Sequence, residues 1–579
     1  MQMMKSKKWL ISLGLAVVLV VAFALPACEP TEQPGWYTPG GERIEFDVSA
    51  PPGTWADIAL MVTSDLQDLG LDVTRRVLDS STYYEYLYEP NLGGMEAFVT
   101  VNDPGPDPWS DWVWMIFGDP LNWGYLWNPV WYNNPDYDEL FIANYLVPNL
   151  TAKEEVLYDM QDILAEDIPA VFLTRNDMLA VHRTDNWGNW YNEMGGFVSW
   201  INEWSLREVT KLGDETQLRI GEIGFPPNLN MNDSALTYTN LGCLYLMFIY
   251  ENLTFYPKVG EDLGAAYDFV PKLATNYTVS YEDDGKGGQN QVWTVDLREG
   301  VKWHDYDTEG KNFTADDVVY TVQNAMSKWG VSRPVDWDWV NNTSNPNYGT
   351  IMPEDMLVTK TGDYQVEIRY IEGWHQNEEY FPSFYQWKPM VPKHKFEGYD
   401  PLEITGDCIG TGPYMVEEFV PDEYLLLTRF DDYWGPLPEP ETILFRQYQD
   451  LGQMLLALEA GEIDNIDGWS VPPQKLADYM ANPDIEVEIV PNMSIHWLGF
   501  NIHPTAGYEP FIDLALREAI AAAINKQNIV DLVHGGYGDI VENFLYPESP
   551  NRKTDLPNNE YDPEAARQIL LDAGYTYVE

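Results

Sequence analysis

The stretch RIEFDVSAPPGTWADIALMVTSDLQDLGLDVTRRV, residues 43–77, sets the fold class of this chain. Ile44 to Val48 alternates apolar and polar residues, as a strand with one buried face does. Thr54 to Leu69 carries apolar residues at helical spacing and stops at Gly70, and Leu71 to Val77 again favours a strand. A strand, a helix and a strand in this order are typical of a β-α-β unit, so we predict an α/β fold with a mainly parallel sheet.

Further stretches support the same fold class. Lys153 to Asp167 has the spacing of an amphipathic helix and leads into a strand-like run, Pro169 to Thr174. Helical patterns also cover Phe511 to Ala523 and Asp562 to Ala573, and the second of these opens with an aspartate cap followed by proline. With 579 residues the chain is too long for one hydrophobic core, so we expect two or three domains.

The first 28 residues have the layout of a secretory signal. Three lysines between positions 5 and 8 precede the apolar run Trp9 to Ala24, and Leu25 to Cys28 is similar to a lipoprotein cleavage box. The apolar run is about 16 residues, shorter than the roughly 20 that span a bilayer. We therefore expect cleavage and lipidation at Cys28, followed by a flexible tether over residues 29–42; an uncleaved N-terminal anchor is the alternative. Either arrangement puts the body of the chain outside the cytoplasm.

The chain is strongly acidic. It has 92 Asp and Glu residues against 33 Lys and Arg residues, which gives a formal net charge of −59. Such a surface repels nucleic acid and anionic lipid headgroups, so we expect no nucleic-acid partner. Because the charges are spread along the sequence, they favour a solvated surface over a specific attraction for cationic solutes.

Aromatic residues and cysteines leave alternatives open. The 23 Trp and 37 Tyr residues suit either a core or the walls of a cleft that stacks on an organic ligand. Besides Cys28, the chain has Cys243 in an apolar helix-like run and Cys408 in a Gly-rich loop. Two free, buried thiols are the favoured interpretation, and a disulfide is the alternative in an exported protein.

Six sequence blocks occur together in the body of the chain. They are Trp293–His304 (WTVDLREGVKWH) with Phe313–Tyr320 (FTADDVVY), then Gly410–Tyr414 (GTGPY), Asp432–Gly435 (DYWG), Leu458–Asp464 (LEAGEID), Leu498–Asn501 (LGFN) and Leu516–Ile524 (LREAIAAAI). In this order they closely resemble the extracytoplasmic solute-binding proteins of ABC importers for oligopeptides, dipeptides and nickel, the family 5 type.

The resemblance implies a two-lobed fold of the periplasmic-binding-protein type II-like class, with a hinge. Lobe one is expected at residues 175–493, and lobe two at residues 494–579 together with residues 43–174. A protein of this kind is expected to act as a monomer without a cofactor, to bind a peptide or other small molecule, and to deliver it to an ABC permease with its ATPase.

The order of the two halves departs from the family. There, the part resembling residues 217–579 comes first and the part resembling residues 43–210 comes last. We therefore interpret the chain as circularly permuted, with the old termini joined at residues 211–216 and the new termini on the surface of lobe two. A fusion of two incomplete copies is the alternative.

The sequence offers little support for catalysis or for a metal site. None of its seven histidines lies four residues from another, and it has no HExxH, no cysteine pair at metal spacing, no GxxxxGK[ST] and no GxSxG. Carboxylates and tryptophans suit a glycosidase, but among 92 acidic residues some pair always looks suitable. We therefore predict a binding protein rather than an enzyme, with no metal ligand set.

Asp103 is the first candidate ligand contact. It follows the strand-like run Ala97 to Val101, so it lies at the carboxyl end of a strand, where α/β proteins form ligand clefts. It also matches the family's segment whose aspartate pairs with the α-amino group of a peptide. The family often has a tryptophan three residues before that aspartate, where this chain has Thr100. A turn residue ahead of a proline is the alternative reading of Asp103.

Four tryptophans complete the candidate set. Trp109 and Trp112 follow Asp103 closely and are candidates for the missing aromatic ring. Trp469 and Trp497 are candidates for the opposite wall or the hinge, and ordinary core positions are the alternative for both. The function expected is that of a lipid-anchored solute-binding protein at the cell membrane; a ligand-sensing receptor of the same fold and a secreted hydrolase are the alternatives.

Overall fold

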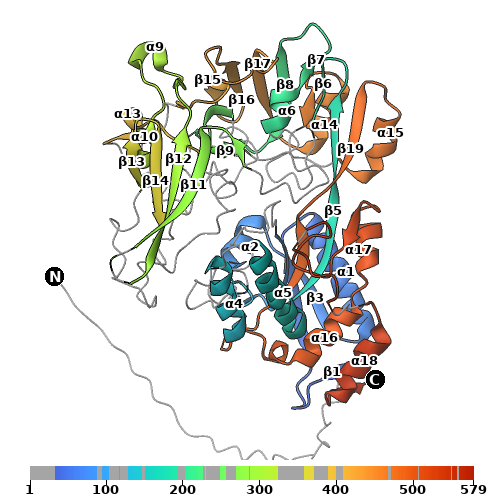
Figure 1. Ribbon diagram of the computed structural model, residues 1–579. Coiled ribbons are helices and arrows are strands. Elements are labelled where there is room, and N and C mark those ends of the chain that lie inside the picture. The colour runs from blue at the N-terminus through green and yellow to red at the C-terminus, as the bar shows by residue number, and fades with distance from the viewer. Residues whose placement is uncertain are drawn as a thin grey trace, which may run out of the picture.

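The computed structural model shows a chain folded into two bodies, one above the other in Figure 1. It describes residues 33–87, 94–102, 117, 128–146, 150–191, 203–225, 228–229, 248–255, 269–283, 285, 287–323, 358–370, 389–398, 408–466, 471–505, 507–549, 551–556 and 560–579. We call the upper body lobe one and the lower body lobe two.

Lobe two combines the two ends of the described chain. Its N-terminal elements are β1 (Gly35–Tyr37), β2 (Glu45–Ala50), α1 (Thr54–Leu69), β3 (Asp72–Val77), α2 (Ser80–Leu87), β4 (Ala97–Asn102), α4 (Pro135–Leu146), α5 (Leu150–Asp167) and the start of β5 (Ala170–Arg183). Its C-terminal elements are β20 (Ile495–Phe500), α16 (Leu514–Ala523), α17 (Lys526–Leu532), β21 (Gly538–Ile540), α18 (Pro563–Asp572) and β22 (Thr576–Val578).

Lobe one holds the middle of the chain. Its first elements are β6 (Trp187–Gly188), α6 (Glu203–Glu208), β7 (Thr210–Lys211), β8 (Gln217–Ile223), β9 (Thr254–Phe255), β10 (Val270–Pro271), β11 (Ala274–Asp283), β12 (Gln289–Leu297), α9 (Tyr306–Glu309) and α10 (Ala315–Gln323). The remainder are β13 (Val358–Gly362), β14 (Gln365–Tyr370), α13 (Lys393–Phe396), β15 (Tyr414–Val420), β16 (Tyr424–Arg429), β17 (Thr442–Tyr448), α14 (Leu451–Glu459), β18 (Asn465–Ile466), α15 (Leu476–Met480) and β19 (Ile485–Pro491).

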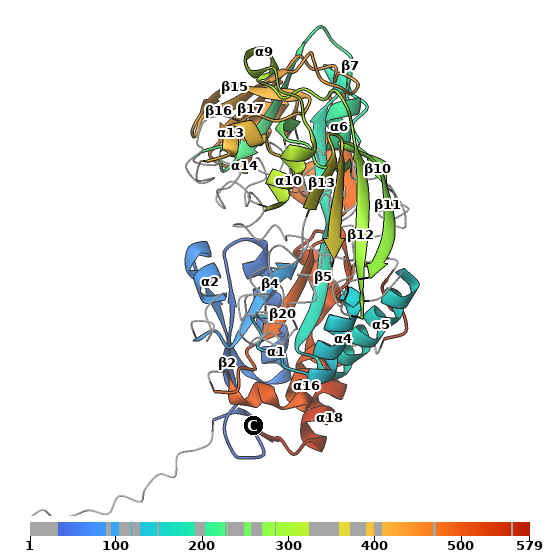
Figure 2. The same cartoon turned by 60° about the vertical axis from the view of Figure 1, so that its left-hand side comes forward.

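One 12-stranded sheet runs through both lobes. Its main order is β15-β16-β17-β8-β18-β5-β20-β4-β2-β3, with β19 and β21 also paired to β5. The 14-residue strand β5 is shared: its first half pairs with β20 and β21 of lobe two, and its second half pairs with β18 and β19 of lobe one. Figure 2 shows β5 passing from one lobe into the other. The strand predicted to end at Thr174 continues to Arg183, because β19 pairs with its second half.

The predicted β-α-β unit is confirmed. Strands β2 and β3 are parallel neighbours, with Phe46 opposite Val73, and α1 connects them along the chain. Helix α1 ends at Gly70, whose φ of 100° is a conformation that glycine adopts without strain. The apolar faces of these elements meet α16 and α18 in one buried core, which includes Ile44, Ile520 and Leu570.

The predicted helices are also present, with shifted boundaries. Helix α5 begins at Leu150 rather than Lys153, and α16 begins at Leu514, where the Asp513 side chain accepts a hydrogen bond from the Ala515 backbone N–H. Helix α18 follows its predicted cap: the Asp562 carboxylate accepts from the backbone N–H groups of Glu564 and Ala565.

The two ends of the described chain lie together on lobe two. Strand β22 pairs antiparallel with β1, placing Val578 opposite Gly35. The Tyr575 hydroxyl donates to Asp513, and Leu570 shares a buried core with Ile44. Residues 211–216 connect β7 to β8 within lobe one, where the Glu441 backbone N–H donates to the Thr216 carbonyl. These are the contacts that a circular permutation predicts, and the permutation itself stays a proposal.

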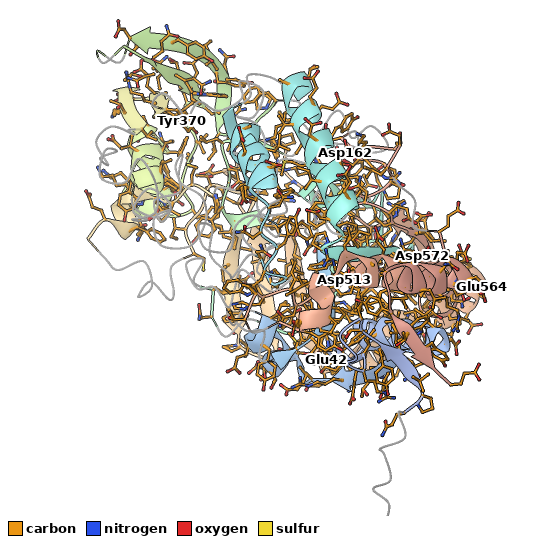
Figure 3. All side chains as sticks on the ribbon, turned by 90° about the horizontal axis from the view of Figure 1, so that it is seen from below. Glu42, Asp162, Tyr370, Asp513, Glu564 and Asp572 are labelled. Carbon is orange, nitrogen blue, oxygen red and sulfur yellow. The ribbon has the colours of Figure 1, made fainter. Side chains whose placement is uncertain are left out.

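The lower surface of lobe two is rich in acidic side chains. Seen from below in Figure 3, Glu42, Asp513, Glu564 and Asp572 lie around α18 and the start of α16. Among the described residues no helix combines the length and the apolar character that a membrane crossing requires.

Candidate functional site

The pairing of the strands shows which edges of the sheet face the junction between the lobes. Strand β5 runs out of lobe two into lobe one, and β18 is antiparallel to it, so β18 and its parallel neighbours β8 and β17 run toward lobe two. In lobe two, β20 starts at the junction and is antiparallel to β4, so β4 and its parallel neighbours β2 and β3 run toward lobe one. Two sets of carboxyl strand ends therefore face one another, the position at which α/β proteins bind ligands.

On the lobe-two side, β4 leads to the first predicted contact. The strand ends at Asn102, paired with Ile495 at the start of β20, and Asp103 is the next residue. The Asn102 side chain is buried, and its Nδ2 has no hydrogen-bond partner among the described residues. A buried amide donor without a partner is costly, so this group is suited to meet an acceptor at the junction. Sequence reasoning did not single out Asn102. Asp103, Trp109 and Trp112 lie outside the described residues.

On the lobe-one side, β18 and β17 end at the facing edge. Strand β18 ends at Ile466, three residues before Trp469, which lies outside the described residues. Strand β17 ends at Tyr448, a half-buried residue whose hydroxyl oxygen is itself buried and has no partner among the described residues. Burial raises the pKa of Tyr448, so the phenol stays protonated and can donate to a ligand.

Trp497 lies in β20, directly opposite Thr100 of β4. Its side chain is buried, with ring centroids 5.6 Å from Phe98 and 6.2 Å from Phe117, in the core beneath the junction. Its indole Nε1 has no partner among the described residues. Trp497 thus supplies an aromatic ring beside Thr100 from the neighbouring strand. A direct contact between Trp497 and a ligand stays a prediction.

The crossing strand β5 is fastened to lobe two by Arg175. Its buried guanidinium donates to Asp539 from Nε at 2.9 Å and to both carboxylate oxygens of Glu548 at 2.6 Å. It also lies 3.4 Å from the carbonyl oxygen of Asn492, in the second crossing segment between β19 and β20. One cation therefore holds β21, a loop of lobe two and both crossing segments together, a role that the sequence did not reveal.

Two buried histidines flank the same crossing. His534 shares a hydrogen bond of 2.9 Å with the Thr174 hydroxyl, and its ring lies 5.5 Å from that of His496. Burial lowers the pKa of His496 to about 3 and that of His534 to about 4. Both rings are therefore neutral at physiological pH and add no positive charge to the junction.

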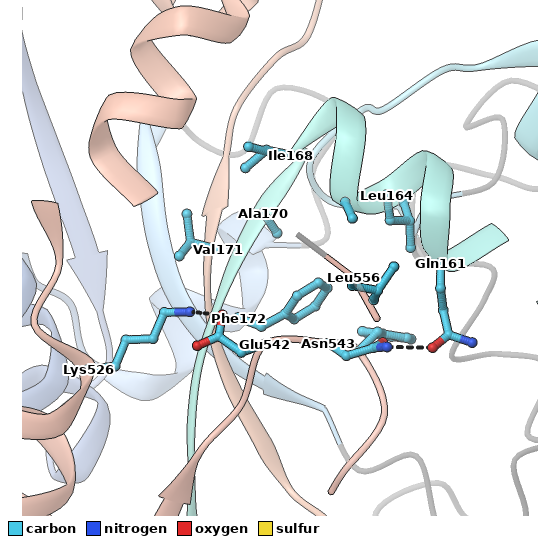
Figure 4. A pocket seen from close by; sticks show the side chains of 12 residues that line it. Gln161, Leu164, Ile168, Ala170, Val171, Phe172, Lys526, Glu542, Asn543 and Leu556 are labelled. Atoms are coloured by element: carbon cyan, nitrogen blue, oxygen red, sulfur yellow. Dashed lines mark hydrogen bonds and ion pairs between the residues drawn. The ribbon is translucent and has the colours of Figure 1, made fainter. Parts of the chain in front are cut away.

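The pocket drawn in Figure 4 lies inside lobe two and is not a solute site. Lys526 donates to Glu542 at 2.8 Å on one side of it, and Asn543 donates to Gln161 on the other. Its volume of about 20 Å³ holds about one water molecule, which excludes an organic ligand.

A model of the bacterial extracellular solute-binding proteins, family 5 (middle region), matches residues 268–579. The chain belongs to this family. Over 312 residues it is 25% identical to a dipeptide-binding protein of Pseudomonas aeruginosa, which covers 53% of this chain and 55% of the relative. The oligopeptide-binding protein AppA of Bacillus subtilis is 26% identical over 375 residues, covering 62% of this chain and 59% of AppA.

A solved structure of Bacillus subtilis AppA with a nonapeptide matches 63% of this chain and 65% of its own length, with 23% identity and a TM-score of 0.43. The chain thus spans little more than half the length of the curated relatives it matches. The sheet shared by the two lobes confirms the predicted two-lobed α/β class for this family 5 protein. The family is described as bacterial extracellular solute-binding proteins, which indicates an extracytoplasmic location for this member.

The structure describes one of the three cysteines of this family 5 protein, Cys408. The Cys408 thiol is half-buried and lies 3.6 Å from the carbonyl oxygen of Leu229. Cys28 and Cys243 lie outside the described residues, so lipidation of the first and any pairing of the second stay predictions.

Proposed function

We propose that this family 5 protein captures a peptide-like or other small organic solute between its lobes and delivers it to an ABC importer. One observation carries the proposal: the carboxyl ends of β2, β3 and β4 face those of β8, β17 and β18 across the junction. Such opposed edges offer a binding surface from each lobe. The names of the relatives, a dipeptide-binding and an oligopeptide-binding protein, support a peptide-like solute.

Closure of the lobes is the proposed working motion. Strand β5 and the segment between β19 and β20 connect the lobes, and a few residues in such segments can absorb a hinge rotation. Closure would bring Asn102 of lobe two and Tyr448 of lobe one toward the same ligand and cover it from water. A permease can then recognise the closed form, and the importer's ATPase supplies the energy for transport.

Asp103 is proposed to pair with the positive amino group of the solute. Replacing Asp103 with alanine is expected to weaken binding by about 2 kcal/mol or more, because the variant leaves the ligand's charge desolvated and unpaired. The measurement is calorimetric titration of the purified chain with a defined set of di- and tripeptides, selected first by the rise in melting temperature.

Two controls make this test specific. Asp572→Ala makes the same charge change on α18, at the far end of lobe two, and should leave affinity unchanged (Figure 3). N-acetylated versions of the same peptides lack the amino charge and should bind the native chain as weakly as Asp103→Ala binds the free peptides. Equal affinity of Asp103→Ala and the native chain for the free peptides would rule out this role.

Anchoring through a lipid on Cys28 is the second part of the proposal. The charged start, the apolar run and the small-residue box before Cys28 support it. Replacing Cys28 with serine is expected to move the protein from the membrane fraction to the soluble fraction of expressing cells, with the fold unchanged. Membrane association that persists in Cys28→Ser would instead point to an uncleaved anchor.

We also propose the permuted order, with lobe one at residues 175–493 and lobe two at residues 43–174 and 494–579. The contact of β22 with β1 and the shared core of α18 and Ile44 support it, because both halves complete one lobe. Residues 211–216 are too few to bridge separate domains, since six extended residues reach only about 20 Å.

A further inference from the structure

His182, Glu486 and Glu488 form a cluster on the lobe-one half of the shared sheet. His182 belongs to β5, and both glutamates belong to β19. One donor atom from each of the three side chains lies within 4.8 Å of the other two, and His182 Nε2 lies 3.3 Å from a carboxylate oxygen of Glu486.

The register of the sheet explains this proximity. His182 stands opposite Glu486, and Ala180 stands opposite Glu488, so all four side chains project from one face. The alternate residues Leu179 and Val181 enter a hydrophobic core on the other face. Because Ala180 has a short side chain, it leaves Glu488 room to approach its diagonal neighbour His182.

A fourth polar group borders the cluster from the other side of β5. Asn465 of β18 is paired with His182, so its side chain lies on the same face, while the next residue, Ile466, joins the hydrophobic core. Asn465 is 4% exposed, and its Oδ1 has no hydrogen-bond partner among the described residues. An oxygen buried without a donor is costly, and it is satisfied by a cation as well as by a hydrogen bond.

We propose that His182, Glu486, Glu488 and Asn465 bind one divalent transition-metal cation of the Zn²⁺ type. The set combines one imidazole nitrogen with carboxylate and amide oxygens, and nitrogen together with carboxylate ligands suits Zn²⁺ and its first-row neighbours better than Mg²⁺ or Ca²⁺. Ligand atoms around a tetrahedral Zn²⁺ lie about 3.4 Å apart. Rotation of the Glu486 side chain, which is 58% exposed, closes the remaining gap and gives the ion a path from solvent.

The electrostatics of the cluster support the assignment. The carboxylates of Glu486 and Glu488 lie close together, and with no cation between them two negative charges repel one another. The Trp190 ring lies 5.3 Å from that of His182, so an aromatic ring borders the cluster.

A bound cation would join β19 to β5 where both strands lead to the crossing between the lobes. It would tie β19, β5 and the end of β18 together within lobe one. The proposed ligands of the cation differ from the residues proposed to bind the solute, so the two proposals can fail separately.

The test is calorimetric titration of the full chain with ZnCl₂ in a Mg²⁺-containing buffer, which occupies weak acidic surface sites. We expect one tight Zn²⁺ per native chain. His182→Ala should weaken it at least tenfold, as should Glu488→Gln, which keeps the shape of the side chain. Glu462→Gln is the matched control for Glu486→Gln, because both carboxylates are 58% exposed; the control should bind like the native chain and Glu486→Gln should bind more weakly.

A second measurement keeps the test independent of stability. Co²⁺ in place of Zn²⁺ should give visible absorption bands of a low-symmetry nitrogen and oxygen site, and these bands should be lost in His182→Ala while its circular dichroism stays native. If Zn²⁺ binds the native chain no more tightly than His182→Ala, the site is wrong. Peptide binding retained in His182→Ala would leave the proposed solute function standing.

Discussion

Replacing Gly410 with alanine is expected to unfold lobe one, with a loss of at least about 4 kcal/mol in the free energy of unfolding. A Cβ at Gly410 would lie 1.7 Å from the carbonyl oxygen of Ile249 and 2.4 Å from its carbonyl carbon. These are backbone atoms, so no side chain can rotate away to relieve the clash. The strand following Gly410 would have to separate from residues 248–250, which are buried in the lobe-one core.

The measurement is urea unfolding followed by tryptophan fluorescence. Gly362→Ala is the matched control in the same lobe, because its Cβ would find its nearest atom at 3.7 Å, and its stability should change by less than about 1 kcal/mol. Equal unfolding midpoints for Gly410→Ala and Gly362→Ala would show that the two backbones do not approach as described.

The segment around Gly410 also brings two of the sequence blocks, Trp293–His304 and Gly410–Tyr414, into contact. His304, at the end of the first block, donates its backbone N–H to the Gly410 carbonyl at 2.9 Å. Its ring lies between the two glycines, with Nε2 2.9 Å from the Gly412 carbonyl and Nδ1 accepting from the Gly410 N–H at 3.2 Å. Burial lowers the pKa of His304 to about 4, so the neutral ring serves as donor on one side and acceptor on the other.

Local pattern was sufficient for the β-α-β unit and for the helices α5, α16 and α18 of lobe two, and insufficient for the connection between the lobes. The unit β2-α1-β3 lies in one continuous stretch of sequence. The spacing of its apolar residues and the helix end at Gly70 both favour this unit, so the sequence predicts it correctly. The length of β5 depends on β19, which joins it from some 300 residues away, and no local pattern contains that pairing. The role of Arg175 could not be predicted for the same reason, because its partners Asp539 and Glu548 lie more than 360 residues away in the sequence.

The candidate site divides in the same way. Asp103, Trp109, Trp112 and Trp469 rest on the resemblance and on their place after strands, and the structure adds that β4 and β18, which precede them, end at facing edges. The prediction that the chain has no metal ligand set rests on the spacing of residues along the sequence. His182 meets Glu486 and Glu488 through strand pairing, a proximity that motif spacing cannot express.

Replacing Arg175 with methionine is expected to cost about 3 kcal/mol of stability. Removing one partner of a buried ion pair costs about 3–5 kcal/mol, and here Asp539 and Glu548 keep 51% and 34% of their side-chain surface exposed, so the lower end applies. Arg175→Lys should cost less, because one ammonium keeps the charge but cannot reach both carboxylates in the forked geometry of the guanidinium. Urea unfolding of the full chain gives both values.

Arg446→Met is the control, since its ion pair with Glu462 is 3.8 Å long and both side chains are about half exposed, and such surface pairs contribute less than about 1 kcal/mol.

The position of Arg175 adds a second, separable expectation. Because its guanidinium joins both crossing segments to lobe two, its loss should widen the distribution of lobe orientations, seen as a larger radius of gyration by X-ray scattering under native conditions. Arg175→Met with the stability and dimensions of the native chain would show that the crossing is held by its strand pairing alone. A loss of stability without a change in dimensions would reduce Arg175 to a clamp within lobe two.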